Sequence, residues 1–210
     1  MNPRDAILAA VRANLPAGQH DRPDIPAFPI AEPDGRIATF QRNLKQMGGQ
    51  ILDHGSDADP LAALRDRLSS ARVVCSAAPE ITGNRPLAEI VHPRDLADVD
   101  VAVVRAACAV AETGSVLLTE AELQENALAY LAQHLVVLLD SSDIVSSIQD
   151  AYHRREFHTA RYAVFHTGPS ATADIEGVLV HGAQGVRSLT VALLPRPQRD
   201  NEASSETGRC

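Results

Sequence analysis

Residues 99–140 read VDVAVVRAACAVAETGSVLLTEAELQENALAYLAQHLVVLLD, and this stretch decides the fold class. It contains three short runs rich in Val and Leu, at 99–105, 115–119 and 134–140. The segment 120–131, before the last run, has apolar residues at helical spacing. Nearly continuous apolar runs are typical of strands that are covered on both faces, as in a parallel sheet. Strands that alternate with helices in this way predict an α/β domain.

The same alternation extends to both sides of this stretch. Further strand candidates lie at 50–53, 72–76, 162–167 and 189–194. Further helix candidates lie at 3–15, 37–47, 144–152 and 172–176, and one more opens at Asp59-Pro60. We therefore predict a single three-layer α/β/α domain with a mostly parallel sheet.

Composition divides the chain into four segments. Its 210 residues are enough for one domain with a full hydrophobic core. We predict an N-terminal helix in residues 1–17, a proline-rich linker or arm in 18–35, the α/β domain in 36–195 and a disordered polar tail in 196–210. The N-terminal helix is as suited to packing on a partner subunit as on its own domain.

Charge and hydropathy exclude several classes of partner. The formal net charge is −8 and no run of Lys and Arg opposes it, so we expect no nucleic-acid partner. No apolar stretch reaches the roughly 18–20 residues of a membrane span, and the N-terminus lacks the pattern of a signal peptide. We therefore expect a cytoplasmic protein without a membrane span.

The three cysteines, Cys75, Cys108 and Cys210, lie far apart in the sequence. This odd and dispersed set provides neither a disulfide framework nor the spacing of a zinc or iron–sulfur site. We predict no metal and no cofactor in this chain, so an electron carrier for any redox reaction would belong to another protein.

The segment 111–115, AETGS, is the first that could carry chemistry. Its polar Glu-Thr-Gly step separates two apolar stretches, so the chain turns sharply there. Glu112 could act as a general base or as a ligand for a substrate hydroxyl or a metal. Alternatively, the segment is a hairpin turn whose polar groups satisfy the local backbone.

The segment 167–176, TGPSATADIE, follows a predicted strand and is predicted to begin a short helix. Ser170 suits the N-cap, and a helix start of this kind presents free N–H groups that bind phosphate or carboxylate. Ligands of open α/β sheets bind at the carboxyl ends of strands, where this loop is expected. Alternatively, Asp174 and Glu176 only complement the helix dipole.

The segment 181–187, HGAQGVR, has two glycines three residues apart and suggests a tight or mobile loop. Arg187 could hold a carboxylate through two parallel hydrogen bonds, or it could be a solvated charge. The sequence contains neither a GxSxG motif nor a Walker-type loop, which argues against a serine hydrolase and an NTPase.

In this order and spacing, these segments resemble the lactate-utilisation protein C family, the stand-alone members of the LUD domain group. The resemblance covers nearly the whole chain except the C-terminal tail. It is carried by AETGS at 111–115, HLVV at 134–137 leading to Ile144-Val145, TGPSATADIE at 167–176, Gly-x-x-Gly at 182–185 and RDAIL at 4–8.

The resemblance implies a fold similar to that of ribose-5-phosphate isomerase, glucosamine-6-phosphate deaminase and the CoA transferases. It also implies a role in oxidising L-lactate to pyruvate, together with two companion proteins that carry the iron–sulfur clusters. One pocket would then hold Glu112 and Asp174 as catalytic acid–base or hydroxyl-binding groups. Its expected anion- and substrate-binding residues are Thr113, Gly114, Thr167, Gly168, Ser170, Thr172, Gly182, Gly185 and Arg187.

The chain departs from the family pattern at two informative positions. Ala171 stands where the family usually has Arg, and Gln184 stands where it usually has His, in a loop that normally ends Gly-Pro-Arg. If those side chains contact the substrate, this chain has a changed substrate or no catalytic step of its own. Two alternatives therefore stay open: a non-catalytic interaction subunit, and a stand-alone enzyme of the CoA-transferase or sugar-phosphate isomerase kind.

Overall fold

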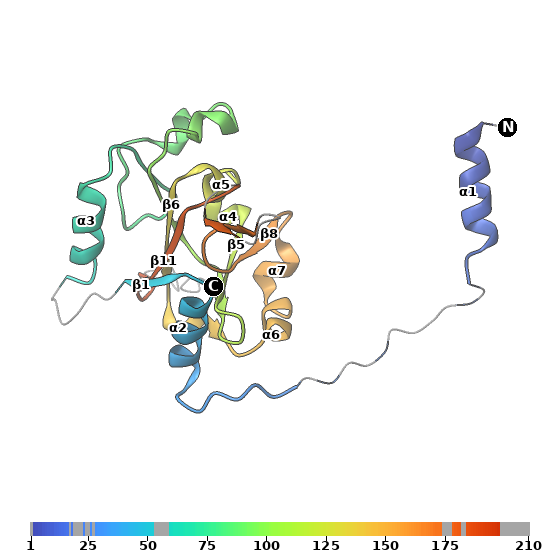
Figure 1. The fold of residues 1–210 in the computed structure, drawn as a ribbon, viewed down its shortest axis with the longest axis horizontal. Helices are drawn as coiled ribbons and strands as arrows, with labels where there is room; N and C mark the ends of the chain where they lie inside the picture. The colour runs from blue at the N-terminus through green and yellow to red at the C-terminus, as the bar shows by residue number, and fades with distance from the viewer. Residues whose placement is uncertain are drawn as a thin grey trace, which may run out of the picture.

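The computed structural model describes residues 2–16, 18, 23, 26, 28–52, 59–173, 178–181 and 184–197. Figure 1 shows the course of the chain. The helices are α1 (Pro3–Ala13), α2 (Arg36–Gln46), α3 (Ala62–Ser69), α4 (Glu120–Leu123), α5 (Leu128–Leu131), α6 (Ile148–Tyr152) and α7 (Arg155–Thr159). Short 3-10 turns occur at Leu87–Glu89, Pro93–Leu96 and Ser141–Asp143.

A five-stranded sheet with only parallel pairs forms the centre of the domain. Its strands, in spatial order, are β1 (Gln50–Leu52), β11 (Ser188–Leu193), β6 (His134–Leu139), β3 (Val101–Arg105) and β2 (Val74–Ser76). Strand β6 lies in the middle, and every residue after His134 in it is buried. Burial on both faces explains the continuous apolar runs. The predicted mostly parallel α/β sheet is confirmed.

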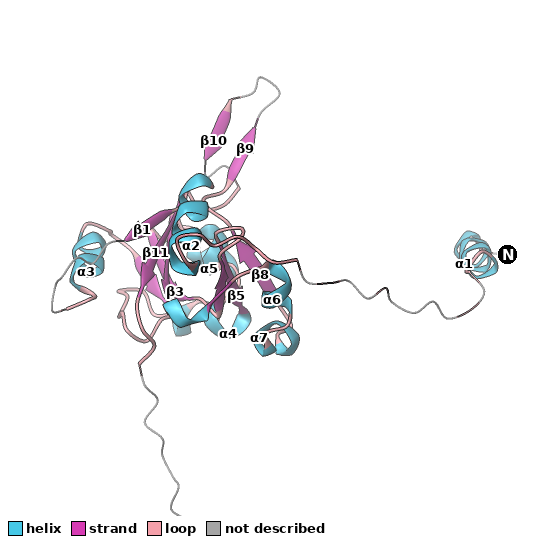
Figure 2. Ribbon diagram, turned by 90° about the horizontal axis from the view of Figure 1, so that it is seen from below, coloured by secondary structure: helices cyan, strands magenta, loops and turns pink. Residues whose placement is uncertain are grey.

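A second sheet of four strands was not predicted from the sequence. Its spatial order is β7 (Ile144–Val145), β4 (Cys108–Val110), β5 (Ser115–Thr119) and β8 (Ala163–His166). Strands β4 and β5 form an antiparallel hairpin in which Val110 pairs with Ser115, so the AETG segment is its turn. A separate hairpin of β9 (Ala171–Ala173) and β10 (Leu179–His181) projects from the domain in Figure 2.

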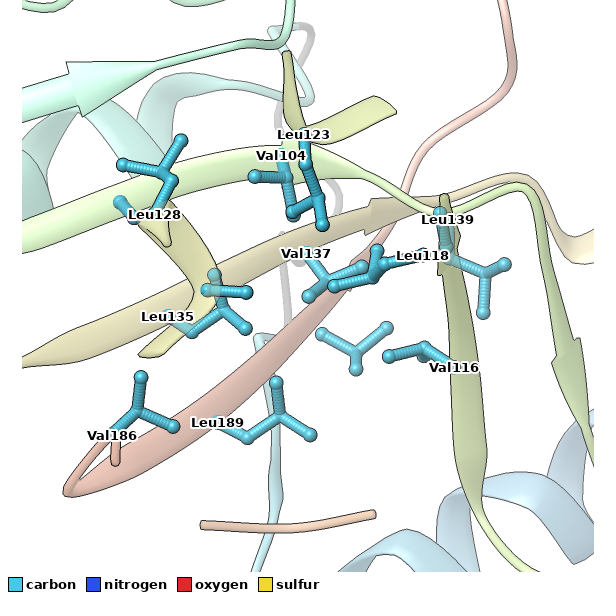
Figure 3. Close-up of a cluster of buried hydrophobic side chains, with 14 of the residues drawn as sticks. Val104, Val116, Leu118, Leu123, Leu128, Leu135, Val137, Leu139, Val186 and Leu189 are labelled. Carbon is cyan, nitrogen blue, oxygen red and sulfur yellow. The ribbon is translucent and has the colours of Figure 1, made fainter. Parts of the chain in front are cut away.

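The main hydrophobic core lies between the two sheets. Figure 3 shows Val104, Leu135, Val137, Leu139 and Leu189 of the parallel sheet facing Val116 and Leu118 of β5, with Leu123 and Leu128 of α4 and α5. Helix α3 covers the opposite face of the parallel sheet, and α6 and α7 cover the outer face of the second sheet. Each fully buried Leu or Val stabilises the fold by about 1.5–3 kcal/mol.

Two predicted helices differ from those observed. The segment 120–131 forms two short helices, because the chain takes a positive φ of 59° at Gln124 and ends α4 there. The segment 144–152 begins with β7, and only its second half is helical. In that segment, pairing of Ile144 with Ala109 of β4 overrides the helical pattern.

The predicted helix at 172–176 is wrong in its described part. Thr172 and Ala173 belong to β9, which pairs with β10 in an antiparallel hairpin. Hairpin pairing satisfies the same backbone groups that a helix start would satisfy, and local N-cap preference does not reveal which partner is present. Residues 174–176 lie outside the described residues.

The two ends of the described chain differ in how they contact the domain. Helix α1 has no buried residue, leaves Ile7 and Val11 exposed, and stands apart from the domain in Figures 1 and 2. Arg196, the first residue of the predicted tail, is instead bound to the domain: its backbone N–H donates to Asp140 Oδ2 at 2.7 Å and its Nε to Asp143 Oδ2 at 2.8 Å. Residues 198–210 lie outside the described range. No helix in the described part of the chain is both long and apolar enough to cross a membrane.

Candidate functional site

Two of the segments singled out in the sequence meet through a chain of hydroxyl groups. Strands β5 and β8 are antiparallel neighbours, and Val116 pairs with His166, so Ser115 and Thr167 come side by side. Thr113 Oγ1 lies 2.7 Å from Ser115 Oγ, which lies 2.5 Å from Thr167 Oγ1. The AETGS and TGPS segments therefore form one continuous polar cluster at the edge of the core.

Gly114 and Gly168 hold helix α2 against these two turns. Both have left-handed backbone conformations, with φ of 69° and 70°. A Cβ on Gly114 would overlap the backbone of Leu44, and a Cβ on Gly168 would overlap the carbonyl of Met47. Because only glycine combines this φ with so close an approach, both residues are needed to pack α2.

Glu112 lies at the N-terminus of helix α6. Its side chain is exposed, and Oε2 accepts a hydrogen bond from the backbone N–H of Ile148 at 3.1 Å. Its backbone carbonyl accepts from Asn43 Nδ2 at 2.9 Å. A carboxylate in this position satisfies a free helix N–H and complements the helix dipole. The catalytic role expected of Glu112 stays a prediction, and the side chain does not line the cavity described next.

A cavity of about 240 Å³ lies where β8 and the TGPS loop meet α5 and the loop 184–186. It brings together four of the predicted site residues, Thr167, Gly168, Ser170 and Gly185. Its apolar walls include Ala129, Val164, Phe165 and Val186, and its polar side chains are Tyr130, His166, Thr167, Ser170 and Gln184. Apolar walls with a few polar groups are typical of sites for small molecules.

His166 is the functional candidate that the sequence analysis missed. Its Nε2 is buried and has no hydrogen-bond partner among the described residues, and burial lowers the pKa of the imidazole to about 4. The ring is therefore neutral at pH 7. It lies 5.2 Å from the ring of Tyr130, measured between centroids. The residue's spacing suggests no metal site, and the only signal in the sequence is its position directly before the TGPS segment.

Tyr130 is also neutral at pH 7. Its hydroxyl forms a hydrogen bond with the hydroxyl of Tyr162, and burial raises the pKa of the phenol well above its usual range. The cavity therefore presents uncharged hydrogen-bonding groups, and none of its described lining residues is an arginine, lysine or acid.

The anion site expected at a helix start after Ser170 is not formed. The chain continues into β9, and the backbone N–H of Ser170 donates to the carbonyl of Val186 at 2.9 Å. Thr172 is exposed on the projecting hairpin and does not line the cavity. Asp174 and Gly182 lie outside the described residues.

Arg187 faces a different pocket. The residue directly follows the cavity loop, its backbone N–H donates to the carbonyl of Gln133 at 2.8 Å, and its side chain is exposed beside Arg67, Arg72 and His134. The predicted site residues are thus not brought into one pocket: four line the cavity, Arg187 lines a second pocket, and Glu112, Thr113, Gly114 and Thr172 line neither.

No thiol or metal cluster is available in the described part of the chain. Cys75 and Cys108 are buried, and burial raises the pKa of Cys108 to about 11, so its thiolate is scarce at neutral pH. The described residues include no group of three or more His, Cys, Asp or Glu side chains that could hold a metal ion.

Comparison with known proteins relates this architecture to one family. The model of the LUD domain family matches residues 41–194. The lactate utilization protein C of Deinococcus radiodurans is 30% identical over 190 residues, which cover 82% of this chain and 88% of that protein. The crystal structure of a DUF162 family protein from the same organism has the same fold, with a TM-score of 0.60 and 19% identity over 78% of this chain and 98% of that chain. The chain therefore belongs to the LUD domain family.

Proposed function

We propose that this protein is a lactate-utilisation protein C-like component of L-lactate oxidation to pyruvate. In this proposal it acts in the cytoplasm with partner proteins that carry iron–sulfur clusters. The observation that carries the proposal is the 30% identity to a lactate utilization protein C over most of both chains. The cavity at the TGPS loop supports it through its size and its polar groups.

The size of the cavity suits a three-carbon acid. Its volume of about 240 Å³ lies below the roughly 300–1,000 Å³ typical of pockets for larger ligands. Lactate carries a carboxylate and a hydroxyl on adjacent carbons. The Ser170 hydroxyl and the Gln184 amide provide donors for the carboxylate, and a neutral His166 provides an acceptor for the substrate hydroxyl. Because neutral donors hold the carboxylate, we expect weak binding.

The redox balance requires an acceptor outside this chain. Oxidation of lactate breaks one C–H and one O–H bond, forms the C=O bond of pyruvate, and releases two electrons and two protons. The three cysteines of this chain lack the clustered spacing of an iron–sulfur site, so in our proposal the electrons pass to a partner. His166 orients the hydroxyl, and since Glu112 does not line the cavity, Asp174 is the proposed acid–base group.

The test is lactate-dependent dye reduction in extracts of the source organism. The gene is left intact, deleted, or replaced by His166→Gln, Ser170→Ala or Asp174→Ala, with His153→Gln on the exposed end of α6 as the matched control. We expect activity to be lost on deletion, to fall at least about tenfold in the three site variants, and to stay unchanged in the control. Undiminished activity in the deletion strain would rule out the role in lactate oxidation.

A non-catalytic interaction subunit is the second candidate, and helix α1 favours it. The helix leaves Ile7 and Val11 exposed, with no packing partner among the described residues, as expected of a docking element. Under this reading the site variants keep full activity, whereas removal of residues 2–29 abolishes it. The two candidates therefore predict opposite results for the same set of strains.

A further inference from the structure

A second pocket, of about 580 Å³, lies at the N-terminal ends of strands β3, β6 and β11. Arg67 reaches it from the last turn of α3, Arg72 from the segment before β2, and Arg187 from the segment before β11. His134, the first residue of β6, completes the basic group. Ser70, Gln133 and Asp100 also line the pocket with polar groups. Three segments distant in sequence, around residues 67–72, 134 and 187, thus bring three arginines to one concave site.

The described carboxylates offset these positive charges only in part, through Asp100 in the pocket and a longer-range interaction of Asp98 with Arg72. Asp100 is the one carboxylate that lines the pocket, and its Oδ2 accepts the backbone N–H groups of Arg72 and Val73, both at 2.9 Å. Arg67, Arg72 and Arg187 form no ion pair with any described carboxylate. The pocket is therefore locally positive in a chain whose net charge is −8.

The pKa of His134 is affected by the excess of positive charge in this pocket. Its pKa lies below the usual value, first because the ring is partly buried and then because Arg67 and Arg187 repel the charged form. Its Nδ1 lies 2.8 Å from the hydroxyl of Ser188. Like charges held close together destabilise the folded chain, and a bound anion would offset that repulsion.

A purely structural role explains only part of this cluster. Arg67 complements the dipole at the C-terminus of α3, as basic residues commonly do. Arg72 and Arg187 lie at no helix end, and they are exposed. The backbone N–H groups along this edge are already used, since Gln133 donates to Val99 and His134 donates to Asp100. Any ligand must therefore be held by the side chains.

We propose that this pocket binds a small phosphorylated metabolite. Three guanidinium groups match the three terminal oxygens of a phosphate monoester, and Arg is the side chain best suited to such oxygens. The net side-chain charge of +2, from three Arg and one Asp, balances a phosphate dianion. The volume leaves room for an organic body larger than the phosphate itself. This site is separate from the cavity at the TGPS loop and does not rest on the proposed lactate function.

The test is isothermal titration of the purified full-length protein with inorganic phosphate, pyrophosphate and citrate at constant ionic strength. The variants are Arg72→Gln and Arg187→Gln, and the control is Arg65→Gln, which removes the same charge from the same helix as Arg67 but outside this pocket. We expect pyrophosphate to bind the wild type, and each pocket variant to weaken binding at least about tenfold, since each removes a charge-assisted hydrogen bond. The control should stay within about twofold.

Three results would overturn this proposal: wild-type protein that does not bind pyrophosphate, equal weakening by Arg65→Gln, and tighter binding of citrate than of pyrophosphate. The first result would mean that the pocket does not bind phosphate groups. The second would mean that binding depends only on the overall charge of the protein. The third would mean that the ligand is a polycarboxylate. Thermal unfolding of each variant without ligand confirms that it is folded.

Discussion

At the scale of single residues, Gly114 and Gly168 show how a motif that suggests chemistry can have a packing role. Both lie in segments with candidate catalytic neighbours, yet each is required because α2 comes within contact of its backbone. The sequence predicted a sharp turn at Gly114 and a loop at Gly168. It could not predict α2 as the neighbour, because residues 44 and 114 meet only in the folded chain.

Gly114→Ala should therefore destabilise the protein strongly. The substitution adds left-handed strain and a Cβ that overlaps the backbone of Leu44, and together these should cost about 3 kcal/mol or more. Gly35→Ala is the matched control, because Gly35 also has a positive φ, 85°, but has open space around its Cβ position. The backbone of Gly35, with φ 85° and ψ 163°, is one that other residues rarely adopt, so we expect a cost of about 1–3 kcal/mol from strain alone there. Urea unfolding measures both, and equal costs would mean that α2 does not press on Gly114.

His166 should make stability depend on pH. Its pKa is about 4 in the folded chain, against about 6.5 in the unfolded chain. Between these values the unfolded chain holds the extra proton, so acidification favours unfolding. As the pH falls from about 6.5 to 4, this difference in proton binding lowers the free energy of unfolding by up to about 3 kcal/mol.

Replacing the imidazole should remove this part of the pH dependence. Between pH 7.5 and pH 4.5, wild-type protein should lose roughly 2 kcal/mol more unfolding free energy than His166→Gln. The same measurement on His153→Gln, at the exposed end of α6, should follow the wild type. Parallel curves for wild type and His166→Gln would show that the imidazole is not buried in a neutral form.

The role of Glu112 illustrates what a motif leaves undetermined. The sequence pattern predicts a sharp turn with a carboxylate beside it, and the structure has both the turn and the carboxylate there. Which group that carboxylate contacts depends on Ile148, 36 residues further along the chain. No local spacing contains that information.

At the scale of elements, a buried ion pair joins Arg105 at the end of β3 to Glu80 in the segment after β2, and Arg105 also donates to the segment after β11. Arg105 donates through Nε to Glu80 Oε1 at 2.8 Å and through Nη1 to the carbonyl of Leu194 at 3.1 Å, and both charged side chains are less than a tenth exposed. Glu80 Oε2 has no partner among the described residues. Among the described residues, the carboxylate of Glu80 thus depends on Arg105 alone.

Removing one member of this ion pair should lower the free energy of unfolding much more than replacing both members with apolar residues. Arg105→Met leaves an unpaired buried carboxylate and should destabilise by about 3–5 kcal/mol, whereas Arg105→Met with Glu80→Leu should recover most of that loss. At the exposed pair of Arg42 and Asp34, Arg42→Met should cost less than about 1 kcal/mol. Chemical denaturation of the wild type and the three variants measures these differences in unfolding free energy. A double variant as unstable as the single variant would argue against a buried unpaired charge.

The elements themselves were predictable where both faces of a strand are buried. The runs that became β3, β5, β6 and β11 were assigned within one or two residues of their observed ends. Strands β4 and β7 were not predicted, because they have three and two residues and leave no pattern of their own. The hairpin of β9 and β10 was taken for a helix start, because its Ser and Thr residues are equally favourable at an N-cap.

At the scale of the whole molecule, the N-terminal segment should be dispensable for stability. Described residues between 2 and 29 are exposed or at most partly buried, and α1 contributes nothing to the core. A chain that begins at Ile30 should melt within about 2 °C of the full chain. Scanning calorimetry of the two proteins tests this. A fall of several degrees would reveal packing of the N-terminal segment on the domain.

The order of strands in the parallel sheet has a consequence for how the protein is made. Among the described strands, the last along the sequence, β11, lies between the first, β1, and β6. While the ribosome still holds the C-terminal segment, β1 has no neighbour in its sheet, and one side of β6 stays open. The nascent chain can assemble β2, β3 and β6, but the final strand must then enter between two waiting edges. Completion of the parallel sheet therefore waits for synthesis of residues 188–193, and a chain that stops before residue 188 has two unprotected, aggregation-prone strand edges.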